Sequence, residues 1–254
     1  MRVKFIGVGE AFDEILPNTS VWVREEREGQ NSSVLLDCGF TVPHYFWRIC
    51  PDPDELDAVW ISHFHGDHYF GIPALLTRFW ESKRKKPLLI LGQEGVDEMI
   101  EKIMRLAYSS ILDKLGFDLR YKTVEPGNPI QAAGLTWSTA PTGHPQRDLA
   151  LRIESGGRSV FYSGDGPGTD ESLALARGCG LLIHEAFLLD ENIPGHGNVV
   201  SCIEFAKKAG AGALALVHIQ RGERRERRAE ILRVMESVKD VRVFMPEPGD
   251  EVEI

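Results

Sequence analysis

The chain contains 254 residues, of which 43% are hydrophobic and 26% are charged, and its formal net charge is −9. This composition excludes a disordered chain, which would hold fewer apolar residues, and a collagen-like chain. The acidic balance argues against a DNA-binding protein, which usually carries a basic face. No run of about 18 apolar residues is present, so we expect no membrane span.

Cysteine usage and the start of the chain predict the compartment. Residues 1–10 resemble a strand and not a signal peptide, because they include a charge at Lys4 and no long apolar region follows. The cysteines are widely spaced and form no Cys-x-x-Cys pair; they are Cys38, Cys50, Cys179 and Cys202. We therefore predict reduced thiols in a cytoplasmic protein.

In the first half, short apolar runs alternate with turns and amphipathic segments. The runs predict strands over residues 3–8, 19–23, 33–37, 57–62 and 88–91. The charged residues 24–31 end in Gly29-Gln30-Asn31, which predicts a hairpin turn. Helical spacing of apolar residues predicts helices over 69–85 and 95–108.

The second half continues in the same style. We predict strands over residues 118–124, 130–133, 135–140, 149–154, 159–163, 181–184, 213–218 and 241–245, the last closing the chain, and helices over 170–178, 201–209 and 223–238. Strands cluster in each half with helices between them, which indicates an α/β fold of two packed sheets with helices outside, a four-layer αββα sandwich. No linker separates the halves, so we predict one domain over residues 1–254.

A histidine cluster follows the strand predicted at residues 57–62. The segment His63-Phe64-His65-Gly66-Asp67-His68 places three imidazoles and one carboxylate within six residues. These groups suit zinc, iron or manganese. Side chains two apart in an extended chain point the same way, so His63 and His65 can share one ion, and Gly66 lets the chain turn toward a second. The alternative is a polar loop that is merely rich in histidine.

Three more polar residues follow buried strands and are further ligand candidates. His144 lies in Thr-Gly-His-Pro, Asp165 in Ser-Gly-Asp-Gly, and His218 after the apolar run 214–217. For each of them alone, a hydrogen-bonded turn residue is the alternative interpretation.

This pattern resembles the metallo-β-lactamase superfamily, and the resemblance covers nearly the whole chain. Gly7-Val8-Gly9, Asn18-Thr19-Ser20 and Leu35-Leu36-Asp37-Cys38-Gly39 also resemble its N-terminal strands. The family implies an αββα sandwich of two mixed sheets with two divalent metal ions, zinc first and manganese or iron as alternatives. By matching position, the resemblance implies a first metal on His63, His65 and His144, a second on Asp67, His68 and His218, and Asp165 as the bridge.

Two further segments resemble the ribonuclease Z-like branch of this family. His184-Glu185-Ala186-Phe187 is similar to its His-Glu-Ala-Thr segment, and Gly195-His196-Gly197-Asn198 to its Gly-His-Ser-Thr segment. In that branch the glutamate and the second histidine assist protonation of the leaving group, which implies that role for Glu185 and His196. A carboxylate beside an imidazole fixes its tautomer and supports its protonated form. The alternative is that Glu185 only caps a turn or forms a salt bridge.

Two departures bear on the substrate. The Ser-Thr of that branch is Gly197-Asn198 here, and only residues 145–164 separate His144 from Asp165. Bacterial tRNA-processing members carry a tRNA-gripping arm in that interval, so we expect the arm to be absent. The arginine-rich residues 224–228 are interleaved with glutamates, as in Glu223 with Arg227, which predicts a solvated helix face.

We therefore predict a metal-dependent phosphodiesterase in which Asp67 also orients the attacking water and His196 protonates the leaving oxygen. The substrate would be a small phosphodiester or an RNA. A lactonase or arylesterase of the same fold and a non-catalytic metal-binding accessory protein are the alternatives, and a homodimer is left open. We expect Tyr45-Phe46-Trp47, Tyr69-Phe70 and Phe79-Trp80 to pack in the core, with stacking on a base as the alternative.

Overall fold

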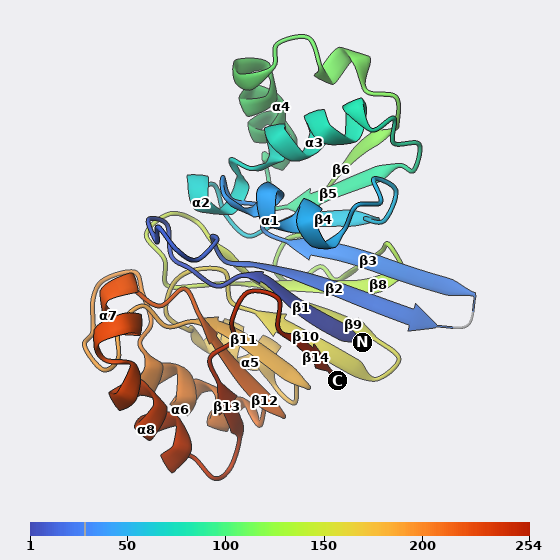
Figure 1. The fold of residues 1–254 in the computed structure, drawn as a ribbon. Coiled ribbons are helices and arrows are strands. Elements are labelled where there is room, and N and C mark those ends of the chain that lie inside the picture. Colours follow the sequence, from blue (N-terminus) through green and yellow to red (C-terminus); the bar gives the residue numbers. More distant parts are fainter. Residues whose placement is uncertain (28) are drawn as a thin grey trace.

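The computed structural model describes residues 1–27 and 29–254, and over these residues the strands form two mixed sheets of seven (Figure 1). Pairing in the first sheet is antiparallel from β14 to β3 and parallel from β3 to β6. In sheet order its strands are β14 (Glu251–Glu253), β1 (Arg2–Gly7), β2 (Ser20–Arg27), β3 (Gln30–Leu36), β4 (Ala58–Ile61), β5 (Leu88–Gly92) and β6 (Leu119–Thr123).

The second sheet is also half parallel and half antiparallel. Pairing is parallel from β13 to β10 and antiparallel from β10 to β7. In sheet order its strands are β13 (Arg242–Phe244), β12 (Ala213–Val217), β11 (Leu181–Glu185), β10 (Arg158–Tyr162), β9 (Leu149–Ser155), β8 (Leu135–Pro141) and β7 (Ile130–Ala132).

The central core lies between the two sheets. Trp60 of β4 and Trp137 of β8 are fully buried, and their ring centroids are 6.3 Å apart. Because strand side chains alternate, Ala58 and Trp60 point into this core while Val59 and Ile61 point to the cluster beneath the helices. A strand covered on both faces is apolar throughout, which is why the sequence of β4 shows no polar alternation.

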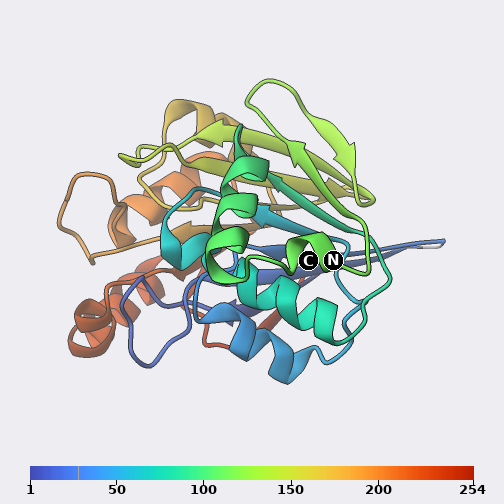
Figure 2. The same ribbon diagram turned by 90° about the horizontal axis from the view of Figure 1, so that it is seen from above.

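Helices form the two outer layers (Figures 1 and 2). The first sheet carries α1 (Val42–Ile49), α2 (Gly66–Tyr69), α3 (Ile72–Glu81), α4 (Val96–Ala107) and the 3₁₀ turn η1 (Leu112–Lys114). The second carries α5 (Asp170–Ala176), α6 (Val199–Ala209), α7 (Arg221–Glu226) and α8 (Arg228–Ser237). Each layer has its own apolar cluster against its sheet. The predicted αββα sandwich of two mixed sheets is therefore confirmed, while the single domain over residues 1–254 stays a prediction.

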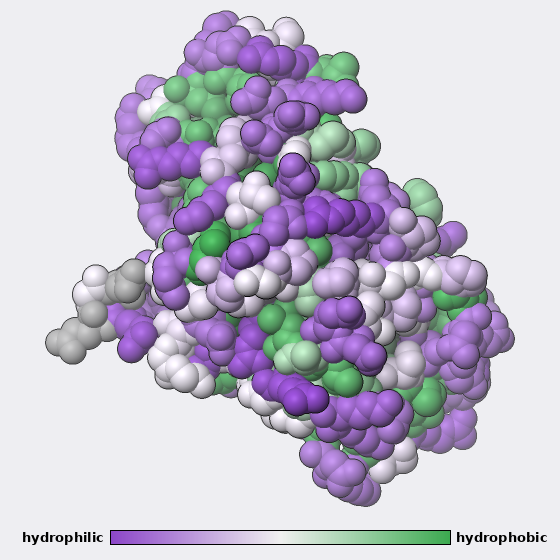
Figure 3. Space-filling model, turned by 180° about the vertical axis from the view of Figure 1, so that it is seen from behind, coloured by the Kyte–Doolittle hydropathy of each residue, from purple (hydrophilic) through white to green (hydrophobic). Residues whose placement is uncertain are grey.

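The face of the molecule turned away from Figure 1 is mostly hydrophilic (Figure 3). On the face turned away from Figure 1, apolar residues form small groups between hydrophilic ones (Figure 3). Within the described residues, no helix combines the length and the apolar character needed to cross a membrane.

The first hairpin differs from the prediction. The charged stretch predicted as a turn largely continues the strands, so that β2 and β3 pair from Val21 with Leu36 to Arg27 with Gln30. Charge is tolerated there because it is paired: buried Glu25 lies 3.2 Å from the Met1 amino group. Glu28, part of the predicted turn, lies outside the described residues.

Three other elements also differ from the elements predicted from the sequence. Residues 42–49 form α1, which was not predicted and which begins with Pro43 in its first turn, a position that proline favours. The helix predicted over 223–238 is two helices, because Arg227 leaves helical geometry at φ −103° and ψ 15°. The strand predicted to close the chain is β13, and the chain continues to β14, which pairs with β1.

Candidate metal centre

The histidine motif starts at the end of β4 and turns into a short helix. His65 is extended, with φ −81° and ψ 145°, and directly precedes α2, which begins at Gly66. Asp67 and His68 therefore lie in a helical turn, whereas His63 lies in the loop before it. The chain thus changes direction at Gly66, as expected. The turn packs tightly, since a Cβ at Gly39 would collide with the carbonyl oxygen of Asp67.

Three strand ends of the second sheet bring the remaining predicted residues to this turn. His144 follows β8, Asp165 follows β10 and His218 follows β12. His218 has a φ of 56°, in the left-handed region that non-glycine residues rarely adopt. Its amide donates to the carbonyl of Val8 at 2.9 Å, which ties this bend to the first sheet. We call the seven residues together the histidine–aspartate cluster: His63, His65, Asp67, His68, His144, Asp165 and His218.

One half of the cluster gathers three imidazoles and one carboxylate. The Nδ1 atom of His65 lies 3.0 Å from Nε2 of His63 and 3.1 Å from Nε2 of His144. Oδ2 of Asp165 lies 3.9 Å from Nε2 of His63. Ligand atoms of these four residues all lie within 4.8 Å of one another, so they could hold one metal ion.

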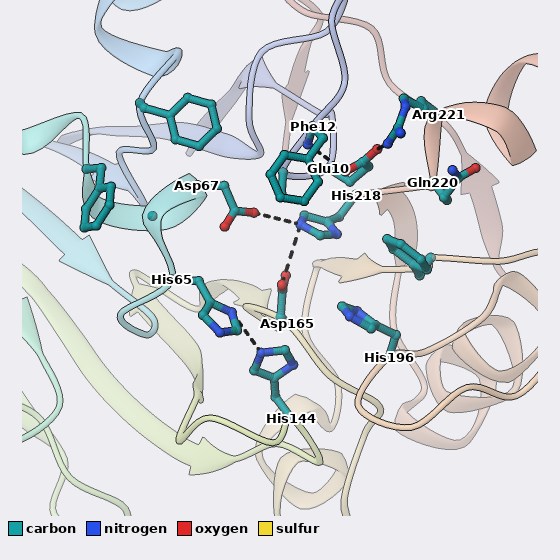
Figure 4. Close-up of a pocket in the computed structure, with 15 residues that line it drawn as sticks. Glu10, Phe12, His65, Asp67, His144, Asp165, His196, His218, Gln220 and Arg221 are labelled. Atoms are coloured by element: carbon teal, nitrogen blue, oxygen red, sulfur yellow. Dashed lines mark hydrogen bonds and ion pairs between the residues drawn. The ribbon is translucent and has the colours of Figure 1, made fainter.

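The other half gathers two imidazoles around two carboxylates. Nε2 of His218 lies 3.3 Å from Oδ2 of Asp67 and 3.5 Å from Oδ2 of Asp165 (Figure 4). Nε2 of His68 lies 3.3 Å from Asp67 and 3.4 Å from Oδ1 of Asp165. Since Asp165 faces both halves with its carboxylate, it occupies the position between two candidate metal positions.

Two buried aspartates that were not predicted as site residues support the cluster from behind. Asp148 Oδ2 lies 2.7 Å from Nδ1 of His63, and Asp37 Oδ2 lies 2.7 Å from Nδ1 of His68. Asp37 also accepts a hydrogen bond from the hydroxyl of Tyr162, which belongs to the opposite sheet, at 2.7 Å. A carboxylate on the far nitrogen fixes the orientation of an imidazole and leaves its other nitrogen free for a metal.

Electrostatics affect His63 and His218 in opposite directions. Burial, with the nearby charge of His68, lowers the pKa of His63 to about 4. Burial also opposes charge on His218, but Asp165 and Asp67 outweigh it and raise its pKa to about 9. The nitrogen lone pairs of His63 are thus available at neutral pH, whereas His218 must release a proton when a metal binds.

Glu185 and His196 lie beside the cluster, but they are not hydrogen-bonded to each other. Oε1 of Glu185 is 3.6 Å from Nδ1 of His196, which is longer than a hydrogen bond. The carboxylate instead accepts three backbone N–H groups, those of Gly166 at 3.0 Å, Gly197 at 2.6 Å and Phe187 at 3.2 Å. Glu185 therefore holds together the loops that carry the site.

An aromatic neighbour positions His196. The ring of His196 stacks on that of Phe187, with centroids 4.5 Å apart and planes 24° apart. On the other side it lies nearly parallel to His218, at 6.2 Å and 15°. In Figure 4, His196 flanks the cluster on the side away from Asp67.

The cluster opens into a cavity of about 460 Å³. Four phenylalanines line it, and we call them the phenylalanine rim: Phe12, Phe40, Phe70 and Phe187. Of the aromatic segments considered in the sequence, Phe46, Tyr69 and Phe79 are buried, as expected for core packing. Phe70 instead faces the cavity, and Trp80 is exposed. The other three rim residues were not predicted, because each is a single aromatic in a loop.

Helix α7, which overlaps the arginine-rich segment 224–228, anchors the loop that carries Phe12. Arg221 donates to buried Glu10 at 2.6 Å, and Arg225 donates to Asp13 at 3.0 Å and to Glu14 at 2.6 Å. The predicted pair of Glu223 with Arg227 is present at 3.3 Å. The predicted solvated helix face is present, since Arg225 and Arg228 are exposed, but buried Arg224 is an exception. In addition, the ion pairs of α7 join a loop of the first sheet to the second sheet.

Known proteins resemble this chain in sequence and in structure. Ribonuclease BN of Escherichia coli (strain K12) is 26% identical over 271 aligned positions, which cover 86% of this chain and 89% of that protein. The metallo-β-lactamase fold protein YhfI from Bacillus subtilis superposes with a TM-score of 0.77 at 26% identity, covering 99% of both chains. The short form of human tRNase Z superposes with a TM-score of 0.79 at 23% identity, covering 100% of this chain and 99% of that one.

The family itself follows from a direct match. The model of a family described as the beta-lactamase superfamily domain matches residues 32–219, a span that holds the whole histidine–aspartate cluster. Together with the two facing mixed sheets and the ring of histidines and aspartates at their shared edge, this match establishes that the chain belongs to the beta-lactamase superfamily and has its metallo-hydrolase fold.

Proposed function

We propose that the chain is a metal-dependent phosphodiesterase whose histidine–aspartate cluster binds two divalent ions, with zinc as the first candidate and manganese or iron as alternatives. His63, His65 and His144 would hold the first ion, Asp67, His68 and His218 the second, and Asp165 both. The observation that carries this proposal is that Nε2 of His68 and Oδ1 of Asp165 are buried without a hydrogen-bond partner among the described residues. Buried polar atoms are normally satisfied, and these two lie 3.4 Å apart without a hydrogen bond between them, which is the arrangement expected of two ligands to one cation.

The spacing of the donor atoms supports the same assignment. Ligand atoms about 2.0–2.2 Å from one tetrahedral ion lie roughly 3.3–3.6 Å from each other. The contacts of Asp67 and Asp165 with His68 and His218 measure 3.3 to 3.5 Å. The paired carboxylates behind His63 and His68 complete an arrangement typical of histidine ligands.

Bound divalent ions would lower the pKa of water and stabilise the negative charge that develops on a phosphate in the transition state. Asp67, which lines the cavity, would in addition orient the attacking water. His196, held against Phe187 beside the buried charge of Glu185, would protonate the leaving oxygen. A ribose or alkyl alkoxide needs such an acid more than an acidic leaving group does, and the relatives named as ribonucleases support a phosphodiester bond.

Metal analysis coupled to hydrolysis tests this function. We expect about two ions per chain after reconstitution with zinc or manganese, and hydrolysis of bis(p-nitrophenyl) phosphate that exceeds hydrolysis of p-nitrophenyl acetate. Asp165→Ala should lose metal and at least about 10³-fold in turnover, the scale expected when transition-state charge is left uncompensated. Leu106→Ala, which changes an exposed side chain on α4, is the control.

The outcomes separate the alternatives. Faster turnover of the carboxylic ester would favour a lactonase or arylesterase. Stoichiometric metal with no hydrolysis of any ester would favour a metal-binding accessory protein. Metal content that stays near zero after reconstitution would exclude the proposed centre.

A structured tRNA should be a poor substrate. Residues between His144 and Asp165 are occupied by β9, β10 and their connections, which run within the second sheet. No segment remains there to form the tRNA-gripping arm of the bacterial tRNA-processing members, in line with the expected absence of this arm. We expect precursor tRNA to be cleaved at its 3′ end at least about 100-fold more slowly than a single-stranded oligoribonucleotide, which a gel assay with both RNAs measures; equal rates would contradict this.

Three broader assignments complete the proposal. We propose a cytoplasmic location on the basis of cysteine usage, one domain over residues 1–254, and a small phosphodiester or an RNA without a structured elbow as the substrate. A homodimer remains an open assignment that light scattering would decide.

A further inference from the structure

Three phenylalanines are exposed around a single opening. Phe12, Phe40 and Phe70 are 76%, 49% and 52% exposed, and all three line the cavity above the histidine–aspartate cluster. They come from separate loops, after β1, after β3 and after α2. Large apolar side chains gathered at one exposed place in this way mark a binding site more often than a chance surface.

The backbone of Phe12 and the ring of Phe70 are held in place although both side chains are exposed. The backbone N–H of Phe12 donates to Oε2 of Glu10 at 2.7 Å, and Glu10 is only 2% exposed. The ring of Phe70 packs on Gly66 of the metal loop, where a Cβ would come within 2.8 Å of it. Ligand contacts made from backbone that is already ordered lose less entropy on binding, so flat contacts with these side chains are efficient.

Charge around the cavity limits the substrate to few phosphates. Among the described residues that line the cavity, Arg221 is the one lysine or arginine, and its guanidinium already lies 2.6 Å from Glu10 and 3.9 Å from Glu14. A ligand with further phosphates would therefore meet carboxylates and phenyl rings where it needs cations. The net charge of −9 adds to this repulsion.

We propose, building on the phosphodiesterase function above, that the substrate is a small phosphodiester carrying one flat, uncharged ring, such as a nucleobase, which stacks on the phenylalanine rim. A cavity of about 460 Å³ suits a ligand the size of a mononucleotide. In the reaction one P–O bond breaks, water adds its hydroxyl to phosphorus, and the proton goes to the leaving oxygen beside His196. Phe12 and Phe70 are then specificity-determining residues.

Three ribose 2′,3′-cyclic phosphates that differ only at C1 test this proposal: one bears adenine, one phenyl and one methoxy. Stacking on aromatic side chains contributes about 1–3 kcal/mol per base, which corresponds to about 5- to 150-fold. We expect kcat/KM for the adenine and phenyl compounds to exceed that for the methoxy compound by this factor. In Phe12→Ala and Phe70→Ala the ratio of kcat/KM for the adenine compound to that for the methoxy compound should shrink toward one.

Matched variants and a binding measurement make the result specific. Leu106→Ala removes a side chain that is 79% exposed and lies outside the cavity, so it should keep the full advantage. Phe12→Tyr keeps an aromatic ring, so it should retain the advantage of the adenine and phenyl compounds that Phe12→Ala loses. Calorimetric titration with the ring-opened products, with and without adenine, should show the same preference without turnover.

Each outcome decides between the two proposals. An advantage for adenine alone that depends on Phe12 and Phe70 supports a nucleobase, and one for phenyl as well supports any flat ring. Three outcomes would overturn the ring proposal but not the phosphodiesterase function. They are equal rates on all three compounds, an adenine advantage that persists in both variants, and hydrolysis of bis(p-nitrophenyl) phosphate without hydrolysis of any ribose compound. Failure to hydrolyse any phosphodiester would overturn the phosphodiesterase itself.

Discussion

The histidine–aspartate cluster and the phenylalanine rim lie within one cavity but are held in different ways. Behind the cluster, Asp37 and Asp148 are buried and contact the far nitrogens of His68 and His63 at 2.7 Å. The rim rests on loops, and Phe12 depends on one backbone hydrogen bond to Glu10 and on the ion pair of Glu10 with Arg221.

This difference matches the two tasks that we propose for the site. Metal ligation tolerates errors of only about 0.2 Å, so its ligands need rigid partners at buried strand ends. Stacking tolerates a range of offsets and tilts, so exposed loops are sufficient for it. Variants of the cluster and its supports should therefore affect chemistry and metal content, and variants of the rim should affect substrate preference.

Outside the metal ligands themselves, the largest effect is expected at His196, where cluster and rim meet. If His196 protonates a leaving alkoxide, His196→Ala should lower turnover of an alkyl phosphodiester by about 10²–10⁴-fold while metal content is unchanged. The loss should be much smaller for a nitrophenyl ester, whose leaving group departs without a proton. Steady-state kinetics on both esters measure this, and equal losses would mean that His196 only positions the substrate.

A supporting aspartate should have the next largest effect. Asp37→Asn keeps the shape of the side chain but removes the charge beside Nδ1 of His68. Metal affinity should fall by about 10- to 100-fold at one of two sites, as is usual for such partners. Competition with a chromophoric chelator measures this, and Asp113→Asn, an exposed change, is the control. Unchanged affinity would remove the proposed role of Asp37.

Glu185 should act mainly on stability. Glu185→Gln places an amide donor against one of three backbone N–H donors, those of Gly166, Gly197 and Phe187. A buried unsatisfied donor costs about 1–3 kcal/mol of unfolding free energy, which urea denaturation would detect. Glu204→Gln on α6, an exposed ion pair with Lys207, should cost less than about 1 kcal/mol. Equal stability of both variants would argue that the hydrogen bonds of Glu185 do not stabilise these loops.

The smallest effect is expected at the base of the rim. Glu10→Ala frees the Phe12 loop, so KM for a ring-bearing substrate should rise by about 2- to 10-fold, the cost of ordering one or two side chains on binding. Turnover at saturation and metal content should stay unchanged, and Glu226→Ala on the exposed side of α7 is the matched control. A fall in metal content instead would show that rim and cluster are mechanically coupled.

The same contrast explains what could be predicted from the sequence. Four cluster residues share one short motif, and the other three follow apolar strands, so their type and spacing carry a signal. Asp37 and Asp148 carry none, because an aspartate after a strand has many uses and nothing in the sequence links it to a histidine 31 or 85 positions away. Asp37 lies in a segment that resembles the family, and this was the only available hint.

The rim, α1 and β14 could not be predicted from the sequence, because they depend on tertiary contacts or lack a clear local pattern. Phe12, Phe40 and Phe187 meet only because three loops end at the same edge of the sandwich. Helix α1 was missed because its proline and histidine obscure the apolar face formed by Val42 and Phe46. Strand β14 is only three residues long, and it forms by pairing with β1 at the other end of the chain.

Asp37 joins parts of the molecule that are far apart in the sequence. Its carboxylate accepts hydrogen bonds from the amide of Ser62 at 2.8 Å, from His68 and from Tyr162 of the opposite sheet. The Ser62 amide can exchange with deuterium only when this junction opens. The exchange rate of the Ser62 amide therefore reports how often the two sheets separate at the site. Binding of metal should lower this exchange rate.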